Sequence, residues 1–391
     1  MPTRDARHAP WGATDGPPRA LAALETPVPI VDLDRLALNL DRMAAYAALH
    51  GLALRPHVKT HKAPRVAAEQ MRLGAVGLTC ATPRELEVMS DVARDLLLAY
   101  PPVGAGKVDR LLSLPNALRL TVALDSEDAA RELSMAAEAA ARRVAVYVEL
   151  DVGMRRVGVA GAAEAVALAR VVAELPWLRY AGVAFYPGHV RSPVADQGVA
   201  LRALGDELGE TLAALERAGL RPPVVSGGST PTAWRMHEVP GVTEVRPGTY
   251  VYNDRATALL DACDWDDCAL TVLATVVSTA VPDQAVIDAG SKALGREPLP
   301  AAPNGAVGAD HEGFGALLDR PEVVVQAMSE EHGILDLSRT AWRPAVGDPV
   351  RVVPNHVCVA VHLHEVVYGV RNDTVETSWP VEARGRRRLA E

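Results

Sequence analysis

Short β-branched runs alternate with longer helical patterns between about residues 30 and 260. The first run is PIVDL (Pro29–Leu33), and a helix is predicted from near Asp34 to Gly51. Eight further runs predict strands: LALRPHV from Leu52, VGLTC from Val76, DLLLAY from Asp95, LRLTVAL from Leu118, VAVYVEL from Val144, YAGVAFY from Tyr180, PVVSGG from Pro223 and TEVRPG from Thr243. Thr82 and Ser126 have the residue types and contexts of helix N-caps. Strands separated by helices predict an α/β fold, here a closed (β/α)₈ TIM-type barrel.

The pattern changes after about residue 262, where helical periodicity fades and β-rich runs follow one another. Examples are ALTVLATVVSTAV from Ala269 and TVETSWPVEA from Thr374. This predicts an all-β C-terminal domain, either a sandwich or a small barrel. We therefore expect a barrel domain over 27–262 and a β domain over 263–391, with residues 1–26 flexible or packed on the β domain.

Composition and charge narrow the function classes. Lys and Arg number 40 against 49 Asp and Glu, so the net charge is −9, which disfavours nucleic-acid binding and membrane-surface roles. The longest apolar run is too short for a membrane helix, and the first residues lack the apolar core of a signal peptide. Four cysteines in 391 residues do not make a disulfide framework, so we expect a cytoplasmic protein.

Candidate chemistry lies where the predicted strands end. Lys59 follows the first strand of the barrel, at the rim where barrel enzymes place their sites, and a lysine there suits Schiff-base chemistry. Most single lysines of this kind lie in a solvated turn. However, glycines and hydroxyls follow strands seven and eight, at Ser226-Gly227-Gly228 and around Thr249, where barrels commonly bind phosphate. A lysine and a phosphate site at one barrel mouth together predict pyridoxal 5′-phosphate.

A second candidate site lies in the β domain, at Asn355-His356-Val357-Cys358. On a strand, residues two apart face the same side, so His356 and Cys358 could bind one metal ion. Imidazole and thiolate are zinc ligands, and the soft sulfur disfavours Mg²⁺ and Mn²⁺. Most His-x-Cys pairs do not bind a metal, and consist of a buried free cysteine beside a histidine that is hydrogen-bonded within the protein. Cys263 and Cys268 have no convincing partner ligands and are interpreted as structural.

Several strings together resemble a known family, the fold-type III pyridoxal phosphate enzymes of the D-threonine aldolase and D-serine dehydratase group, relatives of alanine racemase. They run in family order from about residue 27 to 385: RPHVKTHK, ELDVGMRRVGV, FYPGH, SGGST, EVRPGTYVYND, VIDAGSKAL, EEHGI and PNHVC. Each string is weak alone, but the set is specific.

The resemblance implies an alanine racemase-like barrel with a C-terminal β domain, and a homodimer. It makes Lys59 the lysine that carries the cofactor. It assigns two further sets of residues to the cofactor. One set would bind its phosphate (Ser226, Gly227, Gly228, Thr249, Tyr250), and the other would form the pocket around its ring (Arg156, Tyr186). It makes His356 and Cys358 ligands of a divalent metal, with Zn²⁺ favoured and Mn²⁺ or Mg²⁺ as alternatives.

Two reactions fit this resemblance. Aldolases of the group carry His-x-Asp at the metal position, whereas the eukaryotic-type D-serine dehydratases carry His-x-Cys and use Zn²⁺. Cys358 therefore favours dehydration of a small β-hydroxy D-amino acid, such as D-serine or D-threonine, to a 2-oxo acid and ammonia. The alternative is aldol cleavage to glycine and an aldehyde, with His189 as a catalytic base. A metal-free racemase and a non-catalytic pyridoxal phosphate-binding protein are weaker alternatives.

Overall fold

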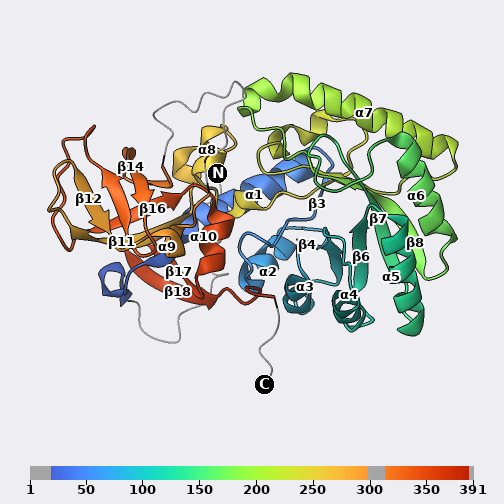
Figure 1. Cartoon of the computed structure of the whole chain (residues 1–391), viewed down its shortest axis with the longest axis horizontal. Coiled ribbons are helices and arrows are strands. Elements are labelled where there is room, and N and C mark those ends of the chain that lie inside the picture. Colours follow the sequence, from blue (N-terminus) through green and yellow to red (C-terminus); the bar gives the residue numbers. More distant parts are fainter. Residues whose placement is uncertain (1–18, 298, 300–312, 387–391) are drawn as a thin grey trace, which may run out of the picture. The chain divides into compact units, whose positions relative to one another are not determined.

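The structure, a computed structural model, describes residues 19–297, 299 and 313–386 (Figure 1). The chain forms two compact units. One, here called the β unit, contains the residues up to Leu40 and Thr249–Glu382; the other, the barrel unit, contains Asp41–Gly248 and the segment from Ala383. These limits differ from the expected 27–262 and 263–391, because strand β2 (Val28–Asp32) pairs with strands of the β unit. Of the expected N-terminal segment 1–26, residues 1–18 lie outside the described part of the chain.

The barrel unit contains an eight-stranded parallel sheet, in the order β3-β10-β9-β8-β7-β6-β5-β4. Its strands are β3 (Ala53–Leu54), β4 (Leu78–Cys80), β5 (Asp95–Leu98), β6 (Arg119–Leu124), β7 (Val144–Leu150), β8 (Leu178–Phe185), β9 (Val225–Gly227) and β10 (Glu244–Val245). A parallel bridge between His57 and Thr79 links the two outer strands, so the sheet curls into a barrel. All eight strands predicted from the sequence are confirmed, and with them the fold class.

Helices connect these strands along the chain. They are α2 (Pro64–Arg72), α3 (Pro83–Met89), α4 (Ala105–Leu112), α5 (Glu127–Ala139), α6 (Ala162–Glu174) and α7 (Gly198–Arg217), with a short 3₁₀ helix η3 (Ala233–Glu238) between β9 and β10. Both predicted N-caps are confirmed, since Thr82 Oγ1 accepts from the Glu85 N–H at 3.2 Å and Ser126 Oγ from the Ala129 N–H at 3.2 Å. Among the described residues, no helix combines the length and apolar character that crossing a membrane requires.

The β unit is a ten-stranded sheet in the order β1-β18-β17-β2-β11-β12-β15-β14-β13-β16. An additional β11–β16 pairing closes six of the strands into a small barrel around an apolar core that includes Val272, Ile287 and Leu335. Besides β2, the strands are β1 (Arg19–Ala20), β11 (Leu270–Ser278), β12 (Gln284–Ile287), β13 (Gly315–Leu317), β14 (Arg320–Met328), β15 (Gly333–Asp336), β16 (Pro349–Pro354), β17 (Val366–Arg371) and β18 (Thr374–Pro380). The expected all-β character is therefore present, although short helices interrupt it: η1 (Leu21–Ala23), η4 (Thr249–Val251), α8 (Arg255–Leu259), η5 (Trp265–Asp267), α9 (Ser291–Leu294) and α10 (Val357–Leu363).

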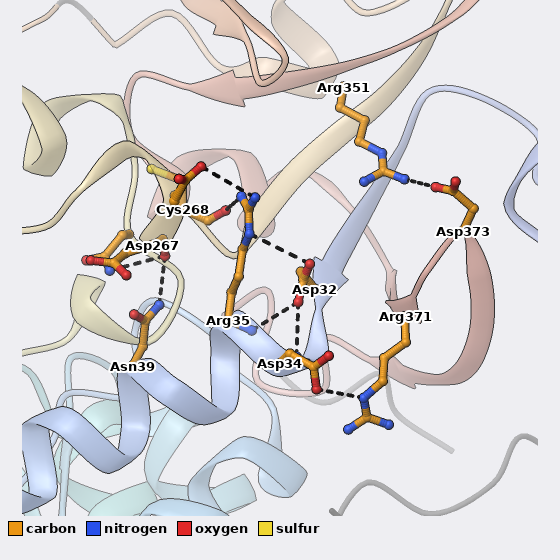
Figure 2. A network of polar contacts seen from close by, with 11 residues as sticks. Asp32, Asp34, Arg35, Asn39, Asp267, Cys268, Arg351, Arg371 and Asp373 are labelled. Carbon is orange, nitrogen blue, oxygen red and sulfur yellow. Dashed lines mark hydrogen bonds and ion pairs between the residues drawn. The ribbon is translucent and has the colours of Figure 1, made fainter. Parts of the chain in front are cut away.

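A polar network fixes the start of helix α1 (Leu33–Leu49) within the β unit (Figure 2). Asp32 Oδ1 accepts from the N–H groups of Asp34 and Arg35, both at 3.0 Å, and so caps the helix. Arg35 Nη1 donates to the Cys268 carbonyl at 3.2 Å. Asn39 Nδ2 donates to the Asp267 carbonyl at 2.8 Å, so the helix also anchors the turn that ends at Cys268.

Candidate active site

Lys59 lies in a tight turn directly after β3, and the turn is held at both ends. The His57–Thr79 bridge holds its start. At its end, the Lys62 N–H donates to the Val58 carbonyl at 2.8 Å, and Lys62 Nζ lies 2.5 Å from Oε1 of the fully buried Glu85. Lys62 takes a left-handed backbone (φ 52°), a conformation that costs a non-glycine residue free energy and persists where surrounding contacts enforce it.

Two predicted site residues, Lys59 and Arg156, lie beside the aromatic ring of a third, Tyr186. Lys59 Nζ lies 5.7 Å from the centroid of the Tyr186 ring, and the guanidinium carbon of Arg156 lies 5.0 Å from the same centroid. Gly188 permits this arrangement, because a Cβ there would come within 2.2 Å of Tyr186 Cε1. The structure thus brings Lys59, Arg156 and Tyr186 together within the barrel unit.

His189 is exposed and packs against the loop that follows β7. A Cβ on Gly153, in that loop, would come within 3.1 Å of the His189 ring. The contact ties His189 to the same loop that carries Arg156.

The predicted glycine loop begins at the end of β9 (Val225–Gly227), and a steric or polar contact explains the residue type at each of its first positions. A Cβ on Gly227 would lie 2.0 Å from Cζ of Phe185, and Gly228 takes φ +90°, so both positions require glycine. The Ser226 hydroxyl donates to Glu244 Oε1 at 2.6 Å inside the barrel. Any contact of Ser226 with a cofactor phosphate is therefore left to its backbone.

The loop after β10 lies beside this glycine loop. The Gly248 N–H donates to Thr230 Oγ1 at 3.3 Å, and a Cβ on Gly248 would come within 3.0 Å of the His57 carbonyl. Thr249 and Tyr250, predicted to serve the same phosphate, belong to η4 in the β unit. There Thr249 Oγ1 lies 3.8 Å from Cys358 Sγ, so its contact is with the candidate metal ligand.

Two buried charged residues that the sequence reasoning did not assign complete the interior of the barrel. Arg246 Nη2 donates to the Phe185 carbonyl at 2.9 Å, but within the described part of the chain its Nε has no hydrogen-bond partner, and neither has Oε2 of Glu149. Burial raises the pKa of Glu149. Burial and the positive charges of Lys59 and Arg246 hold the pKa of His57 well below its usual range, so this imidazole is neutral.

These features fit a phosphorylated aromatic aldehyde such as pyridoxal phosphate. The glycines of the Gly227-Gly228 loop carry no side chain that could cover its backbone N–H groups, and the unsatisfied atoms of Arg246 and Glu149 are polar groups for which a bound ring or substrate can supply partners. Arg246 and Glu149 lie in strings quoted above for the resemblance. The only feature of the sequence that pointed to Arg246 and Glu149 was their position near strand ends. That position does not distinguish a residue of a binding site from a residue of a structural ion pair.

His356 and Cys358 lie at a helix start in the β unit, which corrects the expectation of a strand. Strand β16 ends at Pro354, His356 is the N-cap of α10, and Cys358 lies in the first turn. The two-residue alternation of a strand therefore does not bring them together. The helix start does so, and it brings them close enough that the charge of Cys358 is the largest influence on the pKa of His356.

Asp254 orients the histidine of this pair, and the sequence analysis missed it. His356 Nδ1 lies 3.0 Å from the fully buried Asp254 Oδ2, which also accepts from the Val357 N–H at 3.1 Å. The charge of Cys358, together with the Asp254 carboxylate, raises the pKa of His356 to about 11. A carboxylate behind a histidine is a common second support of metal-binding imidazoles. In the described residues no group of three or more His, Cys, Asp or Glu side chains gathers as a metal site, so the fit rests on this His–Cys pair.

Known proteins match both parts of the chain. Residues 31–256 match the alanine racemase N-terminal domain, and residues 269–370 match the putative serine dehydratase domain. A D-threonine aldolase from Arthrobacter sp is 32% identical over 93% of this chain and 94% of its own length. The crystal structure of D-threonine aldolase from Filomicrobium marinum is 33% identical and superimposes with a TM-score of 0.84, covering 95% of this chain and 99% of that one.

A dehydratase is similar to the same extent. The structure of D-threo-3-hydroxyaspartate dehydratase from Delftia sp. HT23 is 31% identical with a TM-score of 0.82, covering 92% of this chain and 98% of its own. Related structures of a D-threo-3-hydroxyaspartate dehydratase include a histidine-to-alanine variant and, two positions further on, a cysteine-to-alanine variant in the metal-free form. The chain belongs to the alanine racemase N-terminal domain family and, within it, to the fold-type III pyridoxal phosphate-dependent lyases.

Proposed function

We propose that this lyase is a metal-dependent dehydratase that converts small β-hydroxy D-amino acids to a 2-oxo acid and ammonia. The observation that carries the proposal is the His356–Cys358 pair, with His356 oriented by Asp254. A thiolate and an imidazole favour Zn²⁺ over Mn²⁺ and Mg²⁺. The same spacing of histidine and cysteine occurs in the two variants of the related dehydratase.

The barrel unit would hold the cofactor. Lys59 Nζ would carry the aldehyde, Tyr186 and Arg156 would flank its ring, and the N–H groups of the Gly227-Gly228 loop would bind its phosphate. Bound pyridoxal phosphate supplies an electron sink for negative charge that develops at Cα of the substrate.

The remaining steps belong to side chains of this chain. Lys59 Nζ would take the proton from Cα of the substrate. His356 and Cys358 would hold a divalent cation, which would supply Lewis-acid chemistry for departure of the β-hydroxyl. Asp254 keeps the His356 ring in the orientation in which Nε2 is available to the cation.

Aldol cleavage is the second candidate, favoured by the 32% identity over 93% of the chain with a D-threonine aldolase. His356 and Cys358 would hold the same cation, which would supply Lewis-acid chemistry in this reaction too. His189, exposed beside the Arg156 loop, would then take the hydroxyl proton.

One assay separates these reactions. Purified protein loaded with pyridoxal phosphate and Zn²⁺ is given D-serine, D-threonine and D-threo-3-hydroxyaspartate in turn, with the L-enantiomers as controls. We expect a 2-oxo acid and ammonia in equal amounts, lost with a chelator and restored by Zn²⁺. Glycine and an aldehyde instead would overturn the dehydratase in favour of the aldolase. Interconverted enantiomers without either product set would mean a racemase.

A further inference from the structure

A buried ion pair that the proposed reaction does not use lies next to Lys59. Lys62 Nζ lies 2.5 Å from Oε1 of Glu85, and Lys62 is 7% exposed while Glu85 is fully buried. Taking two charges out of water costs free energy, and such a pair often adds little to net stability. Stability alone therefore explains the pair poorly, whereas its place three residues after Lys59 suggests a role in positioning.

Lys62 closes the turn that carries Lys59. The turn starts at Val58, whose N–H donates to the Thr79 carbonyl of β4 at 2.9 Å. It ends at Lys62, whose N–H donates to the Val58 carbonyl at 2.8 Å. Lys59 lies between these ends, and its own N–H donates to His57 Nδ1 at 3.4 Å. The direction in which the Lys59 side chain leaves the turn therefore depends on where Lys62 is held.

Lys62 is held through both its main chain and its side chain. Its carbonyl accepts from the Ala383 N–H at 3.0 Å, and Ala383 begins the C-terminal segment of the barrel unit. Its ammonium group is held by Glu85. The left-handed backbone of Lys62, at φ 52°, is unfavourable for a lysine. These contacts offset that cost, so removing one of them should let the turn relax.

Glu85 is itself fixed at the end of β4. Its Oε2 accepts from the Ala81 N–H at 2.6 Å, and its own N–H donates to Thr82 Oγ1, the N-cap of α3. One carboxylate oxygen thus holds the strand end and the other holds Lys62. Through Glu85, the end of the turn after β3 is tied to the end of β4.

We propose that Lys62 and Glu85 are positioning residues, which hold the turn so that Lys59 Nζ lies beside the Tyr186 ring. That nitrogen is 5.7 Å from the ring centroid. The pair also separates two neighbouring lysines by role, because the amine of Lys62 is occupied by a buried carboxylate. A misplacement of about 1 Å can lower a rate about 10²-fold, so a small relaxation of the turn is measurable. The inference rests on the role proposed for Lys59.

Two variants break the tie in different ways. Glu85→Gln keeps the shape of the side chain and removes its charge. Lys62→Met combined with Glu85→Gln removes both charges, so that no buried ion is left unpaired. Glu127→Gln is the matched control, because it removes a carboxylate from an exposed pair with Arg131 in α5. Urea unfolding shows whether each protein is folded. If neither pair variant folds, the pair serves stability and the inference is overturned.

Anchoring of the turn is measured in the cofactor-free protein by amide hydrogen exchange. Peptides that cover residues 58–62 should exchange several-fold faster in both pair variants than in the wild type. Peptides from β7 and β8 should keep their wild-type rates, and Glu127→Gln should exchange as the wild type throughout. An unchanged rate at the turn would overturn the inference. Equal acceleration across the whole barrel unit would also overturn it, because that result means general destabilisation.

The effect on Lys59 is measured separately, on protein loaded with pyridoxal phosphate and Zn²⁺. Borohydride reduction and peptide mapping should find the cofactor on Lys59 in the wild type, and less of it at the same cofactor concentration in both pair variants. We expect kcat to fall by about 10²-fold with little change in KM. Wild-type labelling and rates in variants with a loosened turn would disprove the positioning. Cofactor on another lysine of the wild type would disprove the proposed role of Lys59, while the anchoring would still stand on hydrogen exchange.

Discussion

At the scale of single residues, the candidate site depends on side chains that reach one ring or one carboxylate from distant parts of the chain. Lys59 and Arg156 meet at Tyr186 in the barrel unit, and His356 meets Asp254 in the β unit. Lys59 is only partly buried and Arg156 is exposed, so replacing either residue should change the chemistry with little effect on folding.

Replacing Lys59 tests its proposed role. Lys59→Ala should lower turnover by about 10³-fold or more, since it removes both the attachment point of the cofactor and the base. Visible absorbance of the bound cofactor after gel filtration and steady-state rates are the measurements. Lys107→Ala, an exposed lysine of the same unit that stacks on Tyr100, should behave as the wild type. Full activity of Lys59→Ala would remove this lysine from the mechanism.

Exchanging the thiolate for a carboxylate tests the metal assignment. In Cys358→Asp the ligand becomes hard, so we expect the metal giving the highest activity to move from Zn²⁺ toward Mn²⁺ or Mg²⁺. Activity of the metal-free protein is titrated with each cation in turn, and the wild type is the control. An unchanged preference for Zn²⁺ would mean that Cys358 does not contact the metal.

Sequence reasoning could propose residues whose position in the pattern was itself informative. Lys59 and Tyr186 follow predicted strands, and the barrel rule places such residues at one rim. Asp254 was missed because its role depends on a contact with His356, 102 positions later in the chain. No local pattern encodes a contact of that kind.

At the scale of elements, the parallel strands were predictable because they are buried, β-branched runs bounded by helices. Helix α10 was not predictable in the same way, because its sequence VCVAVHL is rich in β-branched residues and favours a strand. A tertiary contact stabilises the helix instead. Asp254 Oδ2 accepts from the Val357 N–H, which is one of the donors that the first turn of a helix leaves without a partner. Strand β14 was missed for the converse reason, because RPEVVVQAM begins with proline and charges.

The end of β9 provides the sharpest test of an element. In Gly227→Ala, a methyl group would collide with the Phe185 ring at 2.0 Å, so we expect destabilisation of about 1–3 kcal/mol by overpacking and loss of cofactor affinity. Gly209→Ala, in helix α7 where nothing lies within 4 Å, should instead stabilise the protein by about 0.5–1 kcal/mol. Urea unfolding of both variants measures the difference. Equal effects would mean that Phe185 moves aside freely.

At the scale of the whole molecule, stability should depend on pH through histidines buried without charge. Burial lowers the pKa of His61 to about 3 and also holds that of His57 far down. The unfolded chain takes up these protons near pH 6.5, whereas the folded chain does not. The contribution of these histidines to the free energy of unfolding is therefore fully present above pH 6.5, and it is lost as the pH falls from there toward 3.

Each such group contributes a slope of about 1.4 kcal/mol per pH unit. The free energy of unfolding of the wild type, measured in urea at pH 7, 6 and 5, should fall with acidification. His61→Gln should be less stable at pH 7 but should show a shallower fall. Parallel curves for the two proteins would show that the pKa of His61 is the same in the folded and unfolded states.

The pairing of β2 has a consequence for how the chain is made. Its neighbours in the sheet are β11 and β17, which leave the ribosome more than two hundred residues later. Residues Asp41–Gly248 of the barrel unit are thus inserted within the β unit, and β2 stays unpaired while that segment is synthesised. A truncated nascent chain that stops before Leu270 would carry all eight strands of the parallel sheet together with an unpaired β2, whose open edges are natural targets for chaperones.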